Sequence, residues 1–287
     1  IGGLVATAGF GPRRARYGAI RDLIIGVTLV RADGVVARGG GKVVKNVAGF
    51  DLPKLMCGSL GTLGLVAEAT FRLHPLPETG ATTLFPGLAA EQVPRLVAAM
   101  RQSQLEPSSA VALRSGAGFD LGVRFEGFER GVRQQLASAA EIGRAAGTPC
   151  ESLADDQAFW QGHDRARAAA PLRVKLAALP SRLVEVDALL APLFGALRAG
   201  TFAWYATLGI GFAGGEIADE DGAAAALAAA RARLVDLGGS LVVEAAPGRL
   251  AIDPWGPPPA AFALMTELKQ RFDPHRRLNP GRFVGGL

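Results

Sequence analysis

The sequence is poor in residues that hold metals or form disulfides. Its two cysteines, Cys57 and Cys150, lie far apart and form no Cys-x-x-Cys arrangement. Because an iron–sulfur cluster normally takes four thiolate ligands, we do not expect this chain alone to hold one. The three histidines stand at no ligand spacing, so we predict no metal site. We assign His74, His163 and His275 to surface or packing positions, with His163 on a polar helix face.

Long apolar runs and aromatic side chains are also scarce. The most apolar segment, residues 176–197, is broken by prolines and charged residues, so we predict no membrane span. Aromatic residues make up 7% of the chain, too few to interleave with basic residues along a nucleic-acid-binding face. A hydrophobic content of 49% and a charged content of 20% are typical of a globular protein with an ample core, and 287 residues allow two domains.

The common phosphate-loop motifs are missing as well. A Walker loop requires a glycine five residues before Gly41 and a Ser or Thr after Lys42, where this chain has Val36 and Val43. A Rossmann fingerprint beginning GFG requires its third glycine where Arg14 stands. Neither site is therefore expected.

The chain does have a glycine-rich stretch, GSLGTLG, followed by a strand-like apolar run at residues 65–71. Glycine lets the main chain approach a ligand closely, and successive N–H groups in a tight turn form an anion nest. Two hydroxyls beside the glycines add donors for phosphate oxygens. The alternative is a glycine-rich turn between a helix and a strand. The residues of this predicted anion loop are Gly58, Ser59, Gly61, Thr62 and Gly64.

Three stretches together resemble the FAD-binding (PCMH-type) fold of the vanillyl-alcohol oxidase family. They are residues 1–34, KNVAGFDLPKL at 45–55 and GSLGTLGLVAEATFRLHP at 58–75. Within that family they are most similar to the smaller FAD-binding subunit of bacterial three-subunit glycolate oxidases (glycolate dehydrogenases). FDPHRRLNPGRF at residues 272–283 is similar to the closing motif of the same family.

The resemblance implies FAD as the cofactor. The chain begins within a family motif that follows an N-terminal α/β subdomain, so we expect a fragment that lacks part of the adenine and diphosphate site. The residues that the resemblance implies for FAD binding are Gly2, Gly3, Ala6, Gly58, Ser59, Gly61, Thr62, Gly64, Val66 and Asn279.

The predicted fold class is α+β, the C-terminal part of a PCMH-type FAD-binding domain plus a ferredoxin-like α+β cap domain. Residues 1–78 belong to the FAD domain, residues 79–254 form the cap, and residues 255–287 return to the FAD domain through a helix and a turn. In the cap, strand–helix–strand–strand–helix is followed by a similar series, which predicts an antiparallel sheet backed on one face by helices.

The expected elements follow from hydrophobic period and turn residues. The expected strands are residues 23–30, 35–38, 65–73, 82–85, 109–113, 119–125, 172–177, 201–208, 209–212 and 240–244. The expected helices are residues 52–57, 90–103, 127–146, 155–169, 182–199, 219–237 and 261–272.

In the family, the cap binds the organic substrate. Flavin oxidation of a 2-hydroxy acid requires a base for the hydroxyl proton, a cation for the carboxylate and the flavin as hydride acceptor. Arg173 and Lys175 share one strand face and are candidate carboxylate partners, and Glu244 is a candidate base. The alternative for all three is a charged, solvent-facing strand.

We therefore expect the FAD-binding subunit of a multisubunit glycolate oxidase, an oxidoreductase of bacterial glyoxylate metabolism that oxidises glycolate to glyoxylate. This chain would transfer electrons or support the complex. The resemblance implies a sister FAD-binding subunit and an iron–sulfur subunit as partners, in the cytoplasm or at the inner face of the membrane through the complex. Two alternatives stay open: a self-sufficient FAD-linked 2-hydroxy-acid dehydrogenase, and a non-enzymatic assembly subunit without flavin.

Overall fold

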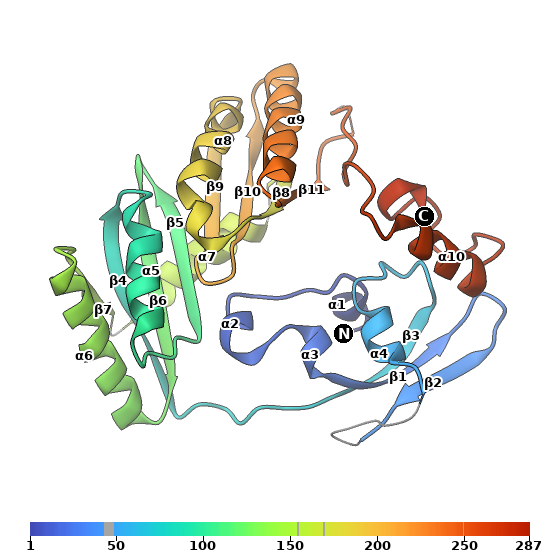
Figure 1. Ribbon diagram of the computed structural model, residues 1–287, viewed down its shortest axis with the longest axis horizontal. Coiled ribbons are helices and arrows are strands. Elements are labelled where there is room, and N and C mark those ends of the chain that lie inside the picture. Colours follow the sequence, from blue (N-terminus) through green and yellow to red (C-terminus); the bar gives the residue numbers. More distant parts are fainter. Residues whose placement is uncertain (43–48, 154, 169, 249) are drawn as a thin grey trace. The chain divides into compact units, whose positions relative to one another are not determined.

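The computed structural model describes residues 1–42, 49–153, 155–168, 170–248 and 250–287 (Figure 1). The chain divides into two compact units, which we describe separately. Unit 1 combines Ile1–Pro75 with Pro257–Leu287, and unit 2 is the continuous stretch Leu76–Gly256. The first four residues of the KNVAGFDLPKL motif, 45–48, lie outside the described residues. The domain limits drawn from the sequence stay predictions.

Unit 1 contains a three-stranded antiparallel sheet in the order β2-β1-β3. Its strands are β1 (Ile24–Val30), β2 (Val36–Gly40) and β3 (Leu65–Phe71). A tight turn joins β1 to β2, because Gly34 adopts a φ of 82° and Asp33 Oδ1 accepts a hydrogen bond from the N–H of Val35 at 3.1 Å. The sheet is thus built around its central strand, β1.

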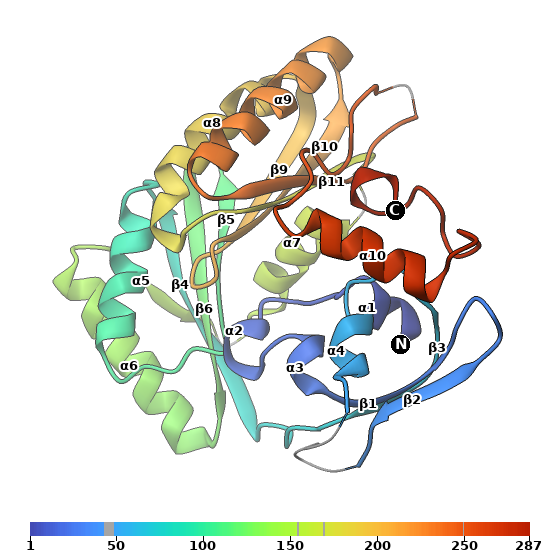
Figure 2. The ribbon, with the colours of Figure 1, turned by 45° about the vertical axis from the view of Figure 1, so that its right-hand side comes forward.

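Short helices and one helix from the C-terminal segment complete unit 1. They are α1 (Gly2–Ala6), α2 (Arg14–Tyr17), α3 (Ile20–Leu23), α4 (Leu52–Met56), α10 (Phe262–Phe272) and the 3-10 helix η2 (Val284–Gly286). Figure 2 shows α10 in red beside α1 and α4. The core of the unit consists of Val5, Ile24, Val27, Leu29, Met56 and Leu63. Phe272 of α10 packs against this core, so residues from both ends of the chain form one unit.

Unit 2 contains an eight-stranded sheet in the order β11-β8-β10-β9-β5-β6-β4-β7, with every pair antiparallel. The first four strands are β4 (Thr79–Leu88), β5 (Ser109–Ser115), β6 (Gly118–Gly127) and β7 (Glu151–Leu153). The last four are β8 (Leu172–Ala177), β9 (Leu197–Tyr205), β10 (Ile210–Ile217) and β11 (Ser240–Ala245). The helices are α5 (Gln92–Gln102), α6 (Glu129–Ala145), α7 (Gln157–Ala168), η1 (Pro180–Arg182), α8 (Leu183–Gly195) and α9 (Glu220–Asp236).

The sheet of unit 2 is made of two similar halves. Each half runs strand–helix–strand–strand–helix–strand, first from β4 to β7 and then from β8 to β11. In each half the strands lie in the spatial order fourth, first, third, second, which is the ferredoxin-like order. The halves join where β5 pairs with β9, with Val111 opposite Tyr205. This arrangement confirms the predicted α+β class and the predicted repetition of the strand–helix series.

Four helices, α5, α6, α8 and α9, contribute to the main core on one face of the sheet (Figure 1). On β8, Leu172, Val174 and Leu176 are buried in this core, as the strand period of two requires. Helix α9 begins where Asp219 Oδ1 accepts a hydrogen bond from the N–H of Gly222 at 3.0 Å. Its alanines let the helix pack closely against its neighbours.

Helix α7 lies on the opposite face, so the prediction that helices back one face alone is wrong. In β6, Leu121 and Val123 join the main core, whereas Gly122 between them faces α7. A Cβ at Gly122 would lie 2.3 Å from the ring of Phe159, so the missing side chain makes room for that ring. A glycine in a predicted strand does not indicate which helix packs against it, so the sequence did not predict the contact between Gly122 and α7.

Several element boundaries also differ from the prediction, most clearly at the end of α8. The helix expected over residues 182–199 ends at Gly195, and β9 begins at Leu197. Leucine and alanine favour a helix there, but pairing of Leu197 with Ile217 of β10 extends the strand. Strand β7 was not predicted, because three residues carry too little pattern to identify a strand.

Candidate functional site

The glycine-rich loop of residues 58–64 lies between α4 and β3 and adopts left-handed backbone conformations. Gly58, Leu60 and Gly61 have φ values of 81°, 53° and 71°. Leucine adopts such a conformation only when its surroundings impose it. The N–H of Leu60 donates to Ala6 O at 2.8 Å, and the N–H of Gly58 donates to Val5 O at 3.0 Å. The last residues of α1 therefore hold the loop in place.

The two loop hydroxyls donate hydrogen bonds inside the loop. Ser59 Oγ donates to Met56 O at 2.9 Å, and Thr62 Oγ1 donates to Ser59 O at 2.7 Å. Both side chains are buried. In this structure the hydroxyls stabilise the turn, which differs from the sequence-based expectation that they supply donors for phosphate oxygens.

Backbone N–H groups of the loop offer donors instead. In the part of the chain that the structure describes, the N–H groups of Gly61, Leu63 and Gly64 donate no hydrogen bond to another residue. N–H groups so close together in a left-handed turn form the kind of nest that binds an anion or a polarised oxygen. This donor set is the main chemical feature of the loop.

The C-terminal segment reaches the loop through Asn279. Its Nδ2 donates to Leu60 O at 2.7 Å, across a separation of 219 residues. A Cβ added to Gly61 would lie 2.8 Å from this Nδ2, which is too close for a real contact. Gly61 is therefore required both by its positive φ and by the approach of Asn279.

A buried lysine forms a second connection between the loop and the C-terminal segment. Lys269 of α10 is 3% exposed, and its Nζ donates to Thr62 O at 2.8 Å, to Leu278 O at 2.9 Å and to Asp273 Oδ2 at 2.6 Å. Asp273 is fully buried and also accepts from the N–H groups of Arg277 and Leu278. Burial raises the pKa of Asp273, but the hydrogen bonds from Lys269 and from these N–H groups outweigh it and lower the pKa to about 2.

Lys269 and Asp273 were not among the site residues predicted from the sequence. The apolar face of the predicted helix is formed by Phe262, Met265, Leu268 and Phe272, and Lys269 stands on the same side, four residues after Met265. A lysine at such a position, with an aspartate four residues later, is a signal for a buried ion pair. The four-residue spacing does not indicate that Lys269 also binds the carbonyl of Thr62 in the loop.

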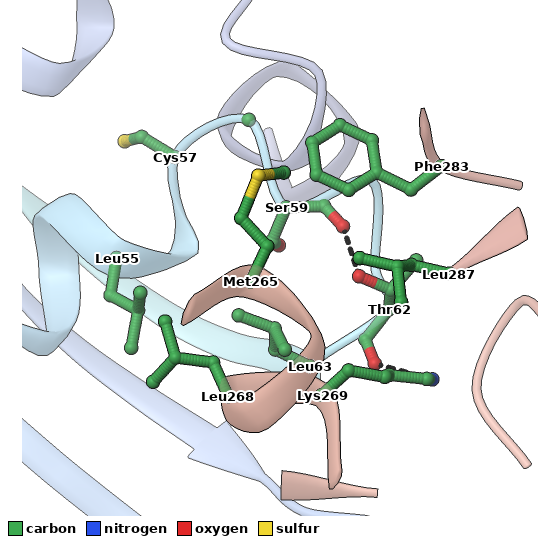
Figure 3. Close-up of a pocket in the computed structure, with 11 residues that line it drawn as sticks. Leu55, Cys57, Ser59, Thr62, Leu63, Met265, Leu268, Lys269, Phe283 and Leu287 are labelled. Atoms are coloured by element: carbon green, nitrogen blue, oxygen red, sulfur yellow. Dashed lines mark hydrogen bonds between the residues drawn. The ribbon is translucent and has the colours of Figure 1, made fainter. Parts of the chain in front are cut away.

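A pocket of about 190 Å³ lies between the loop and α10 (Figure 3). Met265 and Leu268 of α10 form one wall, and residues of α4 and the loop form the other. Complete small-molecule sites usually measure about 300–1,000 Å³, so this pocket suits an apolar part of a larger ligand. Burial raises the pKa of the Cys57 thiol in its wall, which favours the neutral thiol. The side chains that line it are Leu55, Cys57, Ser59, Thr62, Leu63, Met265, Leu268, Lys269, Phe283 and Leu287.

The remaining predicted cofactor residues also lie in unit 1. Gly2 and Gly3 belong to α1, and a Cβ at Gly2 would lie 3.6 Å from Val66 O of β3. Gly64 has Leu29 as a close neighbour and leads directly into β3. The structure thus gathers the predicted residues in one unit, while their binding role stays a prediction.

The catalytic candidates lie on two neighbouring strands of unit 2. Arg173 and Lys175 share one face of β8, and Glu244 follows Val243 on β11, where the pairing register shifts. Arg173 Nη1 lies 3.4 Å from Ala168 O, and Glu244 is exposed. These contacts assign no chemistry to the three residues, so their catalytic role stays a prediction.

Unit 2 also contains a buried polar cluster that the sequence did not reveal. His163 is 3% exposed, so its assignment to a polar helix face is wrong. Its Nε2 lies 2.9 Å from the hydroxyl of Tyr205, and Arg167 Nη1 donates to the same hydroxyl at 3.2 Å. Burial lowers the pKa of His163 and raises the pKa of Tyr205 to about 12, so both stay neutral near pH 7. The cluster fixes α7 to β9.

The described part of the chain contains neither a cluster of potential metal ligands nor a helix that could span a membrane. Within residues 1–42, 49–153, 155–168, 170–248 and 250–287, no group of three or more His, Cys, Asp and Glu side chains is arranged to hold a metal ion. Across the same ranges, no helix combines the length and the apolar character needed to cross a membrane.

Comparison with protein families matches residues 206–283 to the family described as FAD linked oxidases, C-terminal domain. Glycolate oxidase subunit GlcD of Bacillus subtilis (strain 168) is 49% identical over 84 residues, or 29% of this chain and 18% of that protein. Glycolate oxidase subunit GlcE of Escherichia coli (strain K12) is 45% identical over 76 residues, or 26% of this chain and 22% of that protein. A probable mitochondrial D-lactate dehydrogenase of Danio rerio is 28% identical over 239 residues, or 70% of this chain and 48% of that protein. The chain thus spans less than half the length of these relatives.

Two solved structures share the fold. An alkyldihydroxyacetonephosphate synthase structure matches with a TM-score of 0.66 and 17% identity, covering 98% of this chain and 58% of that one. The VAO-type flavoprotein MtVAO615 from Myceliophthora thermophila C1 matches with a TM-score of 0.57 and 17% identity, covering 96% and 59%. At these identities the likeness concerns the fold alone.

Proposed function

We propose that the chain belongs to the FAD-linked oxidase family of PCMH-type flavoproteins and is part of an oxidoreductase that oxidises a 2-hydroxy acid. The names of the relatives support this substrate class, because glycolate and D-lactate are both 2-hydroxy carboxylates. The favoured reaction is oxidation of glycolate to glyoxylate.

The observation that carries the proposal is the glycine loop with its unpartnered N–H groups. The N–H groups of Gly61, Leu63 and Gly64 suit phosphate or carbonyl oxygens of FAD, and the apolar pocket suits part of a ring. Gly61 leaves space beside Asn279 that a Cβ would fill. The residues present therefore fit a portion of FAD, which supplies the hydride acceptor when bound.

We assign the chain an electron-transfer or supporting role beside a sister FAD-binding subunit and an iron–sulfur subunit. The similarity to proteins named glycolate oxidase subunit GlcD and GlcE supports a multisubunit assembly. The similarity to the D-lactate dehydrogenase of Danio rerio favours a second candidate, a self-sufficient dehydrogenase, because it extends over 70% of this chain.

The test is the visible absorption spectrum of the complete protein under anaerobic conditions, with glycolate or D-lactate added. The protein is measured alone and then together with its partner subunits. Flavin that bleaches only in the complex supports the subunit role. Flavin that bleaches in the protein alone supports the self-sufficient enzyme, and the substrate that bleaches it faster identifies the acid. A complete protein without flavin would contradict both candidates.

A further inference from the structure

Two loop carbonyls are held by side chains from the C-terminal segment, and this arrangement determines where neighbouring N–H groups point. Asn279 donates to Leu60 O, and Lys269 donates to Thr62 O. In a trans peptide, the carbonyl of one residue and the N–H of the next lie in one rigid plane and point in opposite directions. Fixing Leu60 O therefore fixes the N–H of Gly61, and fixing Thr62 O fixes the N–H of Leu63.

Both of these N–H groups are among the unpartnered donors of the loop. Resting on the proposed FAD site, we propose that Lys269 is a positioning residue, which orients the N–H of Leu63 toward the cofactor by holding the peptide between Thr62 and Leu63. Asn279 does the same for Gly61. Lys269 itself touches no ligand, because its three N–H donors already have the three protein acceptors Thr62, Leu278 and Asp273.

The charge of Lys269 adds a second effect. A hydrogen bond from a cation to a carbonyl polarises the peptide, so the N–H at the other side of that peptide becomes a stronger donor. The ammonium is 3% exposed, so little water screens it. The N–H of Leu63 is therefore both oriented and strengthened by a side chain 207 residues away from Thr62.

The contacts of Asp273 explain why the lysine is tolerated in the interior. Asp273 neutralises the ammonium and accepts from the N–H groups of Arg277 and Leu278, which fold the turn after α10. Removing Lys269 alone would leave a buried, unpaired carboxylate and lower stability whatever the role of the lysine. The informative variant therefore removes both charges.

The test compares three forms of the complete protein: wild type, Lys269→Met/Asp273→Asn and Arg271→Met. Asparagine keeps one acceptor oxygen, which serves one of the two backbone N–H groups of Arg277 and Leu278. The double variant has no charge at either buried position. Arg271 lies on the same helix, with a 73% exposed side chain paired with Glu267, and its variant controls for loss of a positive charge. The dissociation constant for FAD is measured by flavin fluorescence, and stability by thermal unfolding.

We expect the double variant to stay folded with a somewhat lower unfolding temperature, because Thr62 O and Leu278 O lose the lysine donor. It should bind FAD about tenfold or more weakly, the loss typical of a hydrogen bond from a charged group. Arg271→Met is expected to bind FAD as the wild type does. A double variant that binds FAD within twofold of the wild type would overturn the positioning role.

A second measurement requires no cofactor and reports how well the loop backbone is ordered. Hydrogen exchange of the peptide that spans the loop is followed without FAD in the same three forms. The amides of Gly58, Leu60 and Thr62 are hydrogen-bonded in this structure. They should exchange faster in the double variant than in the wild type, and Arg271→Met should exchange as the wild type does. Equal exchange in all forms would overturn the inference. Absence of FAD from the wild type would instead count against the proposed function.

Discussion

Two separate constraints require glycine at position 61: the backbone conformation and the close approach of the Asn279 side chain. The Gly61 φ of 71° is a conformation that L-residues with a Cβ rarely adopt, and a Cβ there would approach Asn279 Nδ2 at 2.8 Å. The sequence predicted a role for this glycine from its spacing together with the family resemblance. The local spacing of the glycines could not predict the contact with Asn279, because the two residues lie near opposite ends of the chain.

We predict that Gly61→Ala lowers the free energy of unfolding by about 1–2 kcal/mol through its left-handed backbone and weakens FAD binding by displacing Asn279. The measurements are thermal unfolding and FAD affinity of the complete protein. Gly11→Ala is the matched control, because a Cβ there meets nothing within 4 Å and φ is not positive. Flavin affinity unchanged in Gly61→Ala but reduced in Gly11→Ala would contradict the assignment of the loop.

Asp273 predicts how stability depends on pH. Its pKa falls from the ordinary value of 3.8 to about 2 on folding, so the unfolded chain takes up the proton first as pH is lowered. The stabilisation is therefore present above about pH 5 and is lost as pH falls toward 2. Its size is about 2 kcal/mol, at roughly 1.4 kcal/mol for each pKa unit.

Thermal unfolding between pH 6 and pH 2 measures this effect. The wild type should lose more stability over that interval than Lys269→Met/Asp273→Asn, which lacks the titrating carboxylate. Parallel curves for the two proteins would show that Asp273 does not titrate as described.

At the scale of elements, the contact of α7 with the sheet rests on Gly122. We predict that Gly122→Ala destabilises unit 2 by about 1–3 kcal/mol, because its Cβ would overlap the ring of Phe159 on α7. Thermal unfolding of the complete protein measures this loss. The double variant Gly122→Ala/Phe159→Leu should recover part of it, since leucine removes the overlapping ring atoms. Equal losses in the single and double variants would mean that the clash is not the cause.

The stability of α7 should also depend on pH, through the cluster of His163, Tyr205 and Arg167. Burial lowers the pKa of His163, so the unfolded chain binds the proton more readily than the folded chain. Stability is therefore retained above the ordinary pKa of 6.5 and declines as pH falls below it. We expect hydrogen exchange in residues 157–168 to accelerate as pH falls from 7.5 to 5.5, after correction for the intrinsic rate. A His163→Gln variant should lack this extra acceleration.

Most elements could be predicted from periodicity, whereas their partners could not. The strand expected over residues 172–177 and the helix expected over 261–272 match β8 and α10 closely, because alternation and the 3.6-residue period are local signals. The end of α8 and the whole of β7 were missed, since pairing between distant strands decides both. The buried state of Lys269 and His163 was hidden for the same reason: their acceptors, Thr62 O and the Tyr205 hydroxyl, lie 207 and 42 residues away.

At the scale of the whole molecule, charge differs strongly between the units. Unit 1 contains 15 Lys and Arg against 6 Asp and Glu, and unit 2 contains 16 against 20. A basic unit suits a dianionic dinucleotide, because its summed field attracts anions. The acidic unit contributes no such attraction, which agrees with placing the proposed cofactor loop in unit 1.

Unit 2 is continuous in sequence and has its own core, so we predict that residues 76–256 fold when expressed alone. The fragment should unfold cooperatively, bind no FAD and, unlike the basic full chain, bind an anion exchanger at neutral pH. Circular dichroism, thermal unfolding and chromatography measure these properties. A fragment that lacks cooperative unfolding would show that unit 2 depends on unit 1.

Unit 1 closes only when the last residues of the chain return to its first quarter. Lys269 and Asn279 reach loop residues that precede them by 207 and 219 positions. During translation, unit 2 is therefore complete and free to fold before the loop acquires its two C-terminal contacts. The proposed cofactor loop is therefore completed only after unit 2 has been synthesised. A ribosome that stops before Lys269 releases a product in which unit 2 can fold but the proposed cofactor loop lacks both of these contacts.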